Sequence, residues 1–180
     1  PKQFLRYYAL IGGLVSTAVA VGHVVTYVPA DLYVSVFDPN WASTFGLTYK
    51  MGYDGISLIM IVLTNLVTFL ILLSNFNGTL ASNRMFTSMV FFMQVGLLGV
   101  FLSMDGLLFY VFWEISLIPV FLIFLWFGAP GRKADLIKFF IYTFVGSLAM
   151  LFALMMLKVG GSGFEGAASF SWEDLMKVQL

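Results

Sequence analysis

Residues 109–128 read FYVFWEISLIPVFLIFLWFG, an apolar run long enough to cross a bilayer, which requires roughly 20 such residues. One acidic residue, Glu114, interrupts this run, with Trp113 directly before it and Pro119 five residues after it. The run predicts a transmembrane helix. Its single carboxyl group would then lie where lipid cannot solvate it, and most of the functional interpretation depends on that group.

The composition of the whole chain points to a membrane protein. Of its 180 residues, 61% are hydrophobic and only 10% are charged, whereas a soluble domain carries about 25% charged residues. The net charge is zero, so the charge balance indicates no nucleic-acid partner. Cysteine is absent and there is one histidine, which argues against disulfides, iron–sulfur ligation, thiol catalysis, a bis-histidine haem and a conventional metal site in this chain. We expect no cofactor and no metal here.

The hydrophobic pattern predicts an all-α membrane protein, a bundle of about five transmembrane helices forming one domain over residues 1–180. Five stretches are long and apolar enough to span: about 7–28, 55–74, 85–104, 107–127 and 138–158. Residues 29–54 are predicted to be a polar loop. Residues 159–180 open with a glycine run, after which Ser171, followed by Glu173 and Asp174, is typical of a helix start.

Basic residues predict the orientation of these spans. One side of the five-span arrangement carries six basic residues and one acid: Lys2, Arg6, Arg84, Arg132, Lys133 and Lys138, with Asp135. The other side carries three basic residues and seven acids: Lys50, Lys158 and Lys177, with Asp31, Asp38, Asp54, Asp105, Glu165, Glu173 and Asp174. The N-terminus is therefore predicted to be cytoplasmic or matrix-like, and both the loop 29–54 and the segment 159–180 exoplasmic.

Glu114 is the acidic residue deepest in a predicted span, about three residues from its centre and so roughly 4–5 Å from mid-depth. An ionised carboxylate there costs at least about 2.5–3.5 kcal/mol, and intramembrane ionisable groups are functional by default. We predict a proton relay at Glu114; the alternative is a permanently protonated, hydrogen-bonded side chain. No basic residue lies at mid-depth in the five spans, so a charged partner would come from outside them. Pro119 predicts a kink one turn beyond, with the carbonyl of Ile115 released.

Uncharged polar side chains at membrane depth either hydrate a proton path or join helices by hydrogen bonds. They are Gln94, Thr64, Asn65, Thr68, Tyr142, Thr143 and Ser147. His23, near the end of the first span, is an interfacial hydrogen-bonding residue or a relay. Arg132, Lys133 and Lys138 are interpreted as topology determinants and as contacts for lipid or a partner.

Two motifs resemble a known family. The stretch MDGLLFYVFWEISLIPVFLIFLWFG (104–128), followed by IKFFIYTFVGSLAML (137–151), is similar to the antiporter-like membrane subunits of respiratory NADH:quinone oxidoreductase, complex I. The segment WEISLIPVF favours the M type, called subunit 4 in mitochondria. The resemblance is good over residues 50–158, loose over the first span and weak in the loop.

This resemblance implies a function. Glu114 matches the family's membrane glutamate, which pairs with a lysine on the following broken helix and gates proton movement. The chain would be a fragment of a fold of about fourteen helices. It would serve as a proton-translocating subunit of an enzyme complex, hetero-oligomeric with other membrane-arm subunits and in contact with lipids. The family binds no electron carrier in these subunits, so NADH, FMN, iron–sulfur clusters and quinone are expected elsewhere in the complex.

Two alternatives stay open. The chain is also compatible with a subunit of a multisubunit cation/proton antiporter or of a membrane-bound hydrogenase arm, which share the fold and the glutamate. From a different class, it is compatible with a purely structural membrane scaffold. A bacterial plasma membrane is favoured over the mitochondrial inner membrane because no transit segment is recognisable.

Overall fold

The computed structural model describes residues 2–26, 34–37, 49–78, 80, 83–129, 131–161, 164–167 and 169–178. Its long helices are α1 (Lys2–Thr26), α2 (Gly55–Ser74), α3 (Arg84–Leu102), α4 (Gly106–Phe127) and α5 (Lys133–Val159). All five are long and apolar enough to cross a membrane. The predicted all-α membrane fold with five spans is confirmed.

Two helices begin earlier than the hydrophobic pattern predicted. α1 starts at Lys2 instead of residue 7, and α5 starts at Lys133 instead of residue 138. Lysine and arginine are good helix formers, so the helices extend beyond the apolar window that identified them. The predicted end of the first span, at residue 28, lies outside the described residues.

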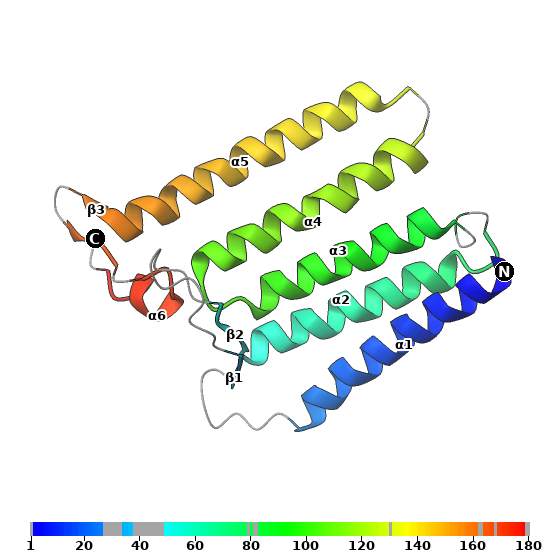
Figure 1. The fold of residues 1–180 in the computed structure, drawn as a ribbon, viewed down its shortest axis with the longest axis horizontal. Coiled ribbons are helices and arrows are strands. Elements are labelled where there is room, and N and C mark those ends of the chain that lie inside the picture. The colour runs from blue at the N-terminus through cyan, green and yellow to red at the C-terminus, as the bar shows by residue number, and fades with distance from the viewer. Residues whose placement is uncertain are drawn as a thin grey trace.

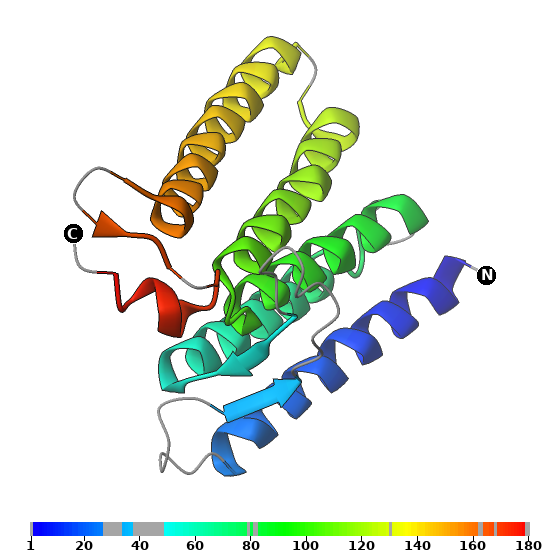
Figure 2. The same ribbon diagram turned by 60° about the vertical axis from the view of Figure 1, so that its left-hand side comes forward.

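The five long helices form a curved row in chain order, each antiparallel to the next (Figures 1 and 2). The start of α1, the α2–α3 connection and the α4–α5 connection lie at one end of this row. We call it the basic end, because Arg6, Arg84, Arg132 and Lys133 lie in or beside these segments. The opposite, acidic end carries the strands, the α3–α4 turn and α6 (Trp172–Leu175).

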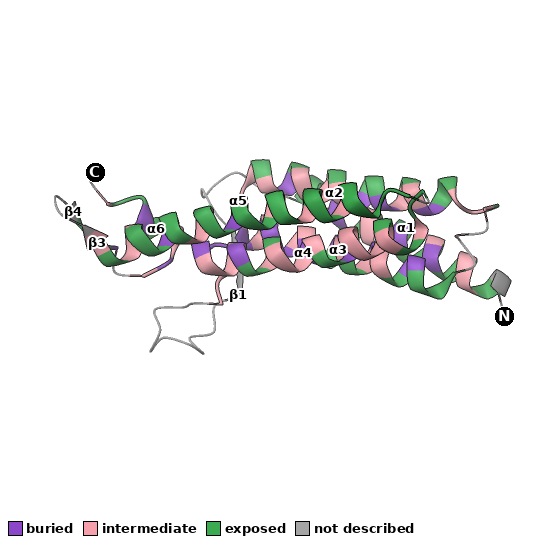
Figure 3. Cartoon of the chain, turned by 90° about the horizontal axis from the view of Figure 1, so that it is seen from above, coloured by how far each residue is buried: buried purple, intermediate pink, exposed green. Residues whose placement is uncertain are grey.

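Most outward-facing side chains of the row are apolar and exposed, as a lipid-facing surface requires (Figure 3). Buried residues lie between the helices instead. One cluster joins α1, α2 and α3 through Ala9, Leu72, Phe86 and Val90. A second joins α4, α5 and the C-terminal segment through Tyr110, Leu154, Ala167 and Leu175.

The predicted loop 29–54 contains two strands that the sequence interpretation missed. β1 (Val34–Phe37) pairs antiparallel with β2 (Met51–Tyr53), and Val34 faces Tyr53 in the register. Residues 29–33 and 38–48 lie outside the described residues. A second short pair, β3 (Gly160–Gly161) with β4 (Phe164–Glu165), follows α5 directly.

The α3–α4 turn connects segments that are far apart in the sequence. The backbone N–H of Met104 donates to the carbonyl of Lys50 at 3.0 Å, and the N–H of Trp172 donates to the carbonyl of Met104 at 3.1 Å. The N–H of Gly106 donates to the carbonyl of Phe170 at 2.7 Å. These bonds fix the turn from which α4, and therefore Glu114, begins.

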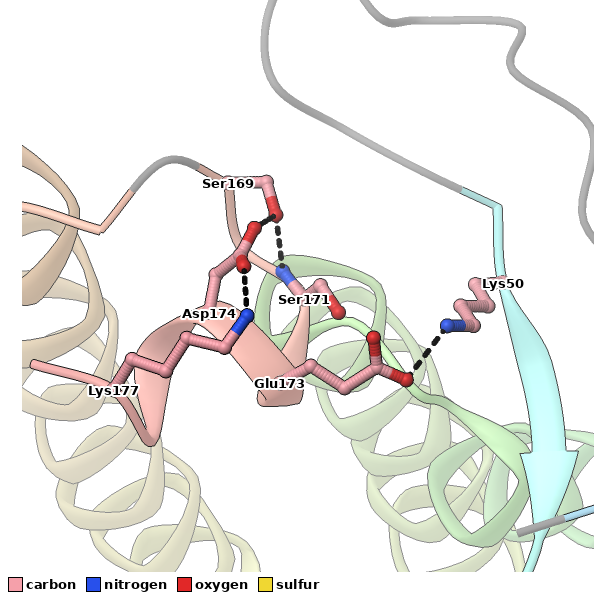
Figure 4. Close-up of polar contacts among 6 residues, drawn as sticks. All are labelled: Lys50, Ser169, Ser171, Glu173, Asp174 and Lys177. Atoms are coloured by element: carbon pink, nitrogen blue, oxygen red, sulfur yellow. Dashed lines mark hydrogen bonds and ion pairs between the residues drawn. The ribbon is translucent and has the colours of Figure 1, made fainter.

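Side chains strengthen this junction at the acidic end (Figure 4). Lys50 forms an ion pair with Glu173 at 2.9 Å, joining the segment before α2 to α6. The predicted helix start at Ser171 is confirmed, but the Ser171 side chain forms no capping bond. Ser169 takes that role in part: its hydroxyl accepts from the N–H of Ser171 and donates to Asp174.

Candidate functional site

Glu114 is positioned by the start of α4. Asp105 is fully buried, and its Oδ1 accepts hydrogen bonds from the N–H groups of Leu107 (3.0 Å) and Leu108 (3.1 Å). This is an N-cap, which satisfies backbone donors that would otherwise lack partners. Glu114 lies eight residues beyond Gly106, about 12 Å along the helix axis at 1.5 Å per residue. The carboxyl group is therefore well inside the apolar length of α4.

Glu114 is half-buried as a residue, and its Oε1 atom is buried with no hydrogen-bond partner among the described residues. The ion pairs in the described part of the chain are Lys50–Glu173 and Lys177–Asp174, so no cation is paired with Glu114 there. The described residues also contain no cluster of three or more histidine, cysteine, aspartate or glutamate side chains suited to a metal. A buried acceptor without a partner is costly, and its presence marks the position as unusual.

Tyr110 lies one turn before Glu114 and was missed by the sequence interpretation. Its buried side chain interacts electrostatically with the Glu114 carboxyl group and with the hydroxyl of Ser147 on α5. The i, i+4 spacing of Tyr110 and Glu114 was the available signal, because such residues are neighbours on a helix surface. Ser147 was predicted, and the structure places it, buried, in this group. Its hydroxyl donates to the carbonyl of Phe144 at 2.8 Å.

Pro119 is fully buried, and α4 continues through it to Phe127. Proline cannot donate a backbone hydrogen bond, so the carbonyl one turn earlier, at Ile115, loses its helical donor. The released carbonyl lies next to Glu114 in the sequence. The kink itself stays a prediction.

Two glycines of α3 bring α4 close at the level of Glu114. A Cβ atom at Gly96 would lie 2.9 Å from the Cα of Ser116, and one at Gly99 would lie 2.2 Å from the Phe112 ring. Only glycine permits this approach. Phe112 and Ser116 lie two residues before and after Glu114. The contact therefore fixes the position of Glu114 along the axis of α4 and the direction in which this part of α4 faces.

A second polar group joins α1, α2 and α3. Gln94 is buried, and its amide nitrogen donates to Asn65 Oδ1 at 2.7 Å and to Ser16 Oγ at 3.2 Å. Asn65 in turn donates to the carbonyl of Ile61 at 2.7 Å. The sequence interpretation found Gln94 and Asn65 but not Ser16, because a serine in an apolar helix gives no signal of its own. These bonds favour the helix-joining role of the two alternatives.

The remaining polar residues are not gathered into a path by the described contacts. Thr64 donates to the carbonyl of Met60, Thr68 to that of Thr64 and Thr143 to that of Phe139. Each hydroxyl is thus satisfied within its own helix. Tyr142 is 77% exposed and faces outward. His23 is exposed and packs edge-on against Tyr53, with ring centroids 6.1 Å apart.

Comparison with known proteins identifies the fold to which this site belongs. A family model described as NADH:quinone oxidoreductase/Mrp antiporter, transmembrane, matches residues 103–177. Residues 103–177 of the chain therefore carry the sequence pattern of this family. The matched residues include Glu114, Tyr110 and Pro119, together with Ser147, Tyr142 and Thr143 on α5. They also include the junction from Ser103 to Asp105 and α6.

Relatives agree with the predicted M-type subunit. The chain is 35% identical over 155 residues to NADH-quinone oxidoreductase subunit M of Escherichia coli K12, covering 81% of this chain and 30% of that protein. It is 28% identical over 176 residues to F(420)H(2) dehydrogenase subunit M of Methanosarcina mazei, covering 97% of this chain and 36% of that protein. The chain thus spans about a third of the length of these relatives.

Solved structures of the family share the arrangement of helices. The whole chain superimposes on part of respiratory complex I from Thermus thermophilus with bound NADH, with a TM-score of 0.83 and 28% identity, covering 35% of that chain. The Mrp complex from Dietzia sp. DQ12-45-1b gives a TM-score of 0.68 at 14% identity, covering 98% of this chain and 19% of that one. The second likeness shows the fold alone.

Proposed function

We propose that this chain is a proton-translocating, non-redox membrane-arm subunit of an NADH:quinone oxidoreductase-type complex, with Glu114 as its relay. The observation that carries the proposal is the buried Oε1 atom of Glu114, which has no hydrogen-bond partner among the described residues. A structural glutamate in an apolar helix would be expected to form a hydrogen bond to a neighbouring helix. An unpartnered carboxyl oxygen is instead available to water or to a group that approaches it.

The mechanism we propose is electrostatic. In a medium of low dielectric constant the neutral carboxylic acid is favoured, and a nearby positive charge favours the carboxylate. When a cationic group in the assembly approaches Glu114, the carboxyl group releases its proton; when the cation withdraws, a proton is taken up. In this mechanism Tyr110 and Ser147, which interact with each other beside Glu114, would hold water next to the carboxyl group. The carbonyl of Ile115, freed by Pro119, would supply a further acceptor on the same helix.

The redox steps of such an enzyme would take place in other subunits. Relatives of this chain carry the names of different electron donors, NADH and F(420)H(2), while sharing this membrane sequence. A membrane subunit that occurs in complexes with different electron donors does not need to bind either donor. NADH, FMN, iron–sulfur clusters and quinone are accordingly assigned to partner subunits of a hetero-oligomeric complex, and quinone reduction is coupled to Glu114 from a distance.

We propose that the chain is located in an energy-transducing membrane, and we favour a bacterial plasma membrane over a mitochondrial inner membrane. In this proposal the basic end faces the cytoplasm. The collection of arginine and lysine at the basic end supports this orientation. The chain has no native cysteine, so single cysteines can report the topology directly. A cysteine at Gly131 should react with an impermeant reagent from the cytoplasmic side and one at Glu165 from the opposite side.

A cation/proton antiporter subunit is the second candidate, because the matching family includes Mrp antiporters and the fold matches an Mrp complex. A membrane-bound hydrogenase arm would share these features. The subunits that copurify with the chain distinguish the assemblies. Exchange of sodium for protons in vesicles, without electron transfer, would favour the antiporter.

The test of the relay is Glu114→Gln in the complete assembly, with proton pumping and electron transfer measured in the same membrane vesicles. Glutamine keeps the size of the side chain and removes the titratable proton. We expect the proton gradient to be lost, with or without a fall in electron transfer, while the complex stays assembled. Glu165→Gln is the matched control, since Glu165 is exposed at the acidic end and forms no ion pair with the described residues. Normal pumping in Glu114→Gln would assign the residue a structural role and leave the scaffold alternative.

A further inference from the structure

A hollow lies at the basic end of the described structure, between the end of α4 and the start of α5. Its volume is about 490 Å³. Four apolar side chains line it: Phe124 and Leu125 from α4, and Leu136 and Phe139 from α5. Phe124 and Phe139 are themselves exposed, so the hollow opens on the outer surface of the helix row.

The same hollow is lined by two cations. Arg132 and Lys133 are both exposed, and neither forms a hydrogen bond through its side chain or an ion pair with the described residues. Arg132 occupies the N-cap position of α5, but its side chain does not cap the helix. Asp135 is the acid in the lining, and Lys138, also exposed, follows on the next turn of α5. The local charge is therefore positive.

We propose that this hollow binds an anionic phospholipid. Its apolar walls suit an acyl chain, and Arg132 and Lys133 suit the headgroup phosphate at the level where the helices leave the apolar layer. Basic pockets between transmembrane helices on the cytoplasmic side bind anionic headgroups, and each basic residue near the surface contributes about a fivefold preference. The two cations favour an anionic lipid over a neutral apolar helix as the occupant of the hollow, because such a helix would leave Arg132 and Lys133 without a partner.

The test is photo-crosslinking in the intact assembly. The probe p-benzoylphenylalanine replaces Leu136 in the lining, and the phospholipids attached after illumination are identified by mass spectrometry. The same probe at Val15, which is exposed on α1, reports the average membrane composition. We expect the anionic-to-zwitterionic ratio at Leu136 to exceed that at Val15, by up to about thirtyfold for two basic residues.

Variants then test the role of charge. Arg132→Gln with Lys133→Gln should reduce the ratio toward the Val15 value, whereas Arg132→Lys with Lys133→Arg should preserve it. Arg84→Gln, at the same end but outside the hollow, is the matched control and should change nothing. Asp135→Asn should raise the ratio. A parent ratio equal to the membrane average, or attachment of the probe mainly to another polypeptide, would overturn the proposal.

Discussion

Substituting Gly96 by alanine tests whether close packing of α3 on α4 holds Glu114 in place. The added Cβ would lie 2.9 Å from both the Cα and the Cβ of Ser116. Carbon atoms in contact lie at 3.5–4.0 Å, so α4 must move away by at least about 0.6 Å. The nearest atom belongs to the backbone, and therefore a rotamer change cannot relieve the contact.

Overpacking of this kind typically costs about 1–3 kcal/mol. Alanine also favours the helix over glycine by about 0.5–1 kcal/mol, which offsets part of the loss. Gly22→Ala is the matched control, because Gly22 is also helical and nothing lies within 4 Å of its Cβ position. Both variants gain the same helix preference, so the difference in their free energies of unfolding isolates the steric cost. We expect Gly96→Ala to be less stable than Gly22→Ala by about 1–3 kcal/mol.

The free energy of unfolding is measured by reversible denaturation in mixed micelles followed by circular dichroism. Pumping in the assembly is measured in parallel, since a displacement near 1 Å at a reacting group costs up to about a hundredfold in rate. Equal stability of Gly96→Ala and Gly22→Ala would refute the close contact. Lower stability with unchanged pumping would show that the position of Glu114 tolerates the displacement.

Three further predictions concern residues outside the relay. Gln94→Leu should lower the free energy of unfolding by about 0.6–1.7 kcal/mol, because Asn65 loses its donor. Proton pumping in vesicles should persist, and a loss of pumping at normal stability would instead favour a hydration path through Gln94. Asp105→Ala should lower the unfolding free energy by about 1–2 kcal/mol through loss of the α4 N-cap, with Asp105→Asn less affected, and equal values for the two would exclude capping. The N–H of Ser57 lowers the pKa of Asp54, and the Ser169 hydroxyl, followed by Lys177, lowers that of Asp174. The stability that these carboxylates contribute is therefore present above their unfolded pKa, near 4, and is lost as the pH falls through their lower folded values; acid denaturation curves of Asp54→Asn and Asp174→Asn should be flatter than that of the parent.

The sequence was sufficient to predict features that depend on one helix at a time. Hydrophobic runs located all five spans, and the single acid in the fourth run identified Glu114. The starts of α1 and α5 were misplaced because hydropathy detects the apolar layer and not the first residue of a helix. The β1–β2 pair was missed because each strand has only three or four residues and their pairing bridges a long connection.

Contacts between helices could not be predicted from the same patterns. Ser16 and Gln94 are 78 residues apart, and nothing in either segment indicates its partner. The junction that joins Lys50, Met104 and Trp172 depends on three separate connections meeting at one end of the row. Tyr110 is different: its spacing from Glu114 was readable, and it was overlooked because aromatic residues are abundant in these spans.

The polar groups in the spans differ in what they can do with a proton. Both N–H groups of the Gln94 amide are directed to acceptors, Asn65 and Ser16, and an amide neither gains nor loses a proton at the pH of a membrane surface. This group can hold α1, α2 and α3 together but cannot store charge. Glu114 has the opposite properties, a titratable group and a buried oxygen without a partner in the described chain. In the proposed relay the first three helices are a fixed support, and the glycines of α3 hold α4 against it. The Glu114 carboxyl group would then respond to charges brought from outside these five spans.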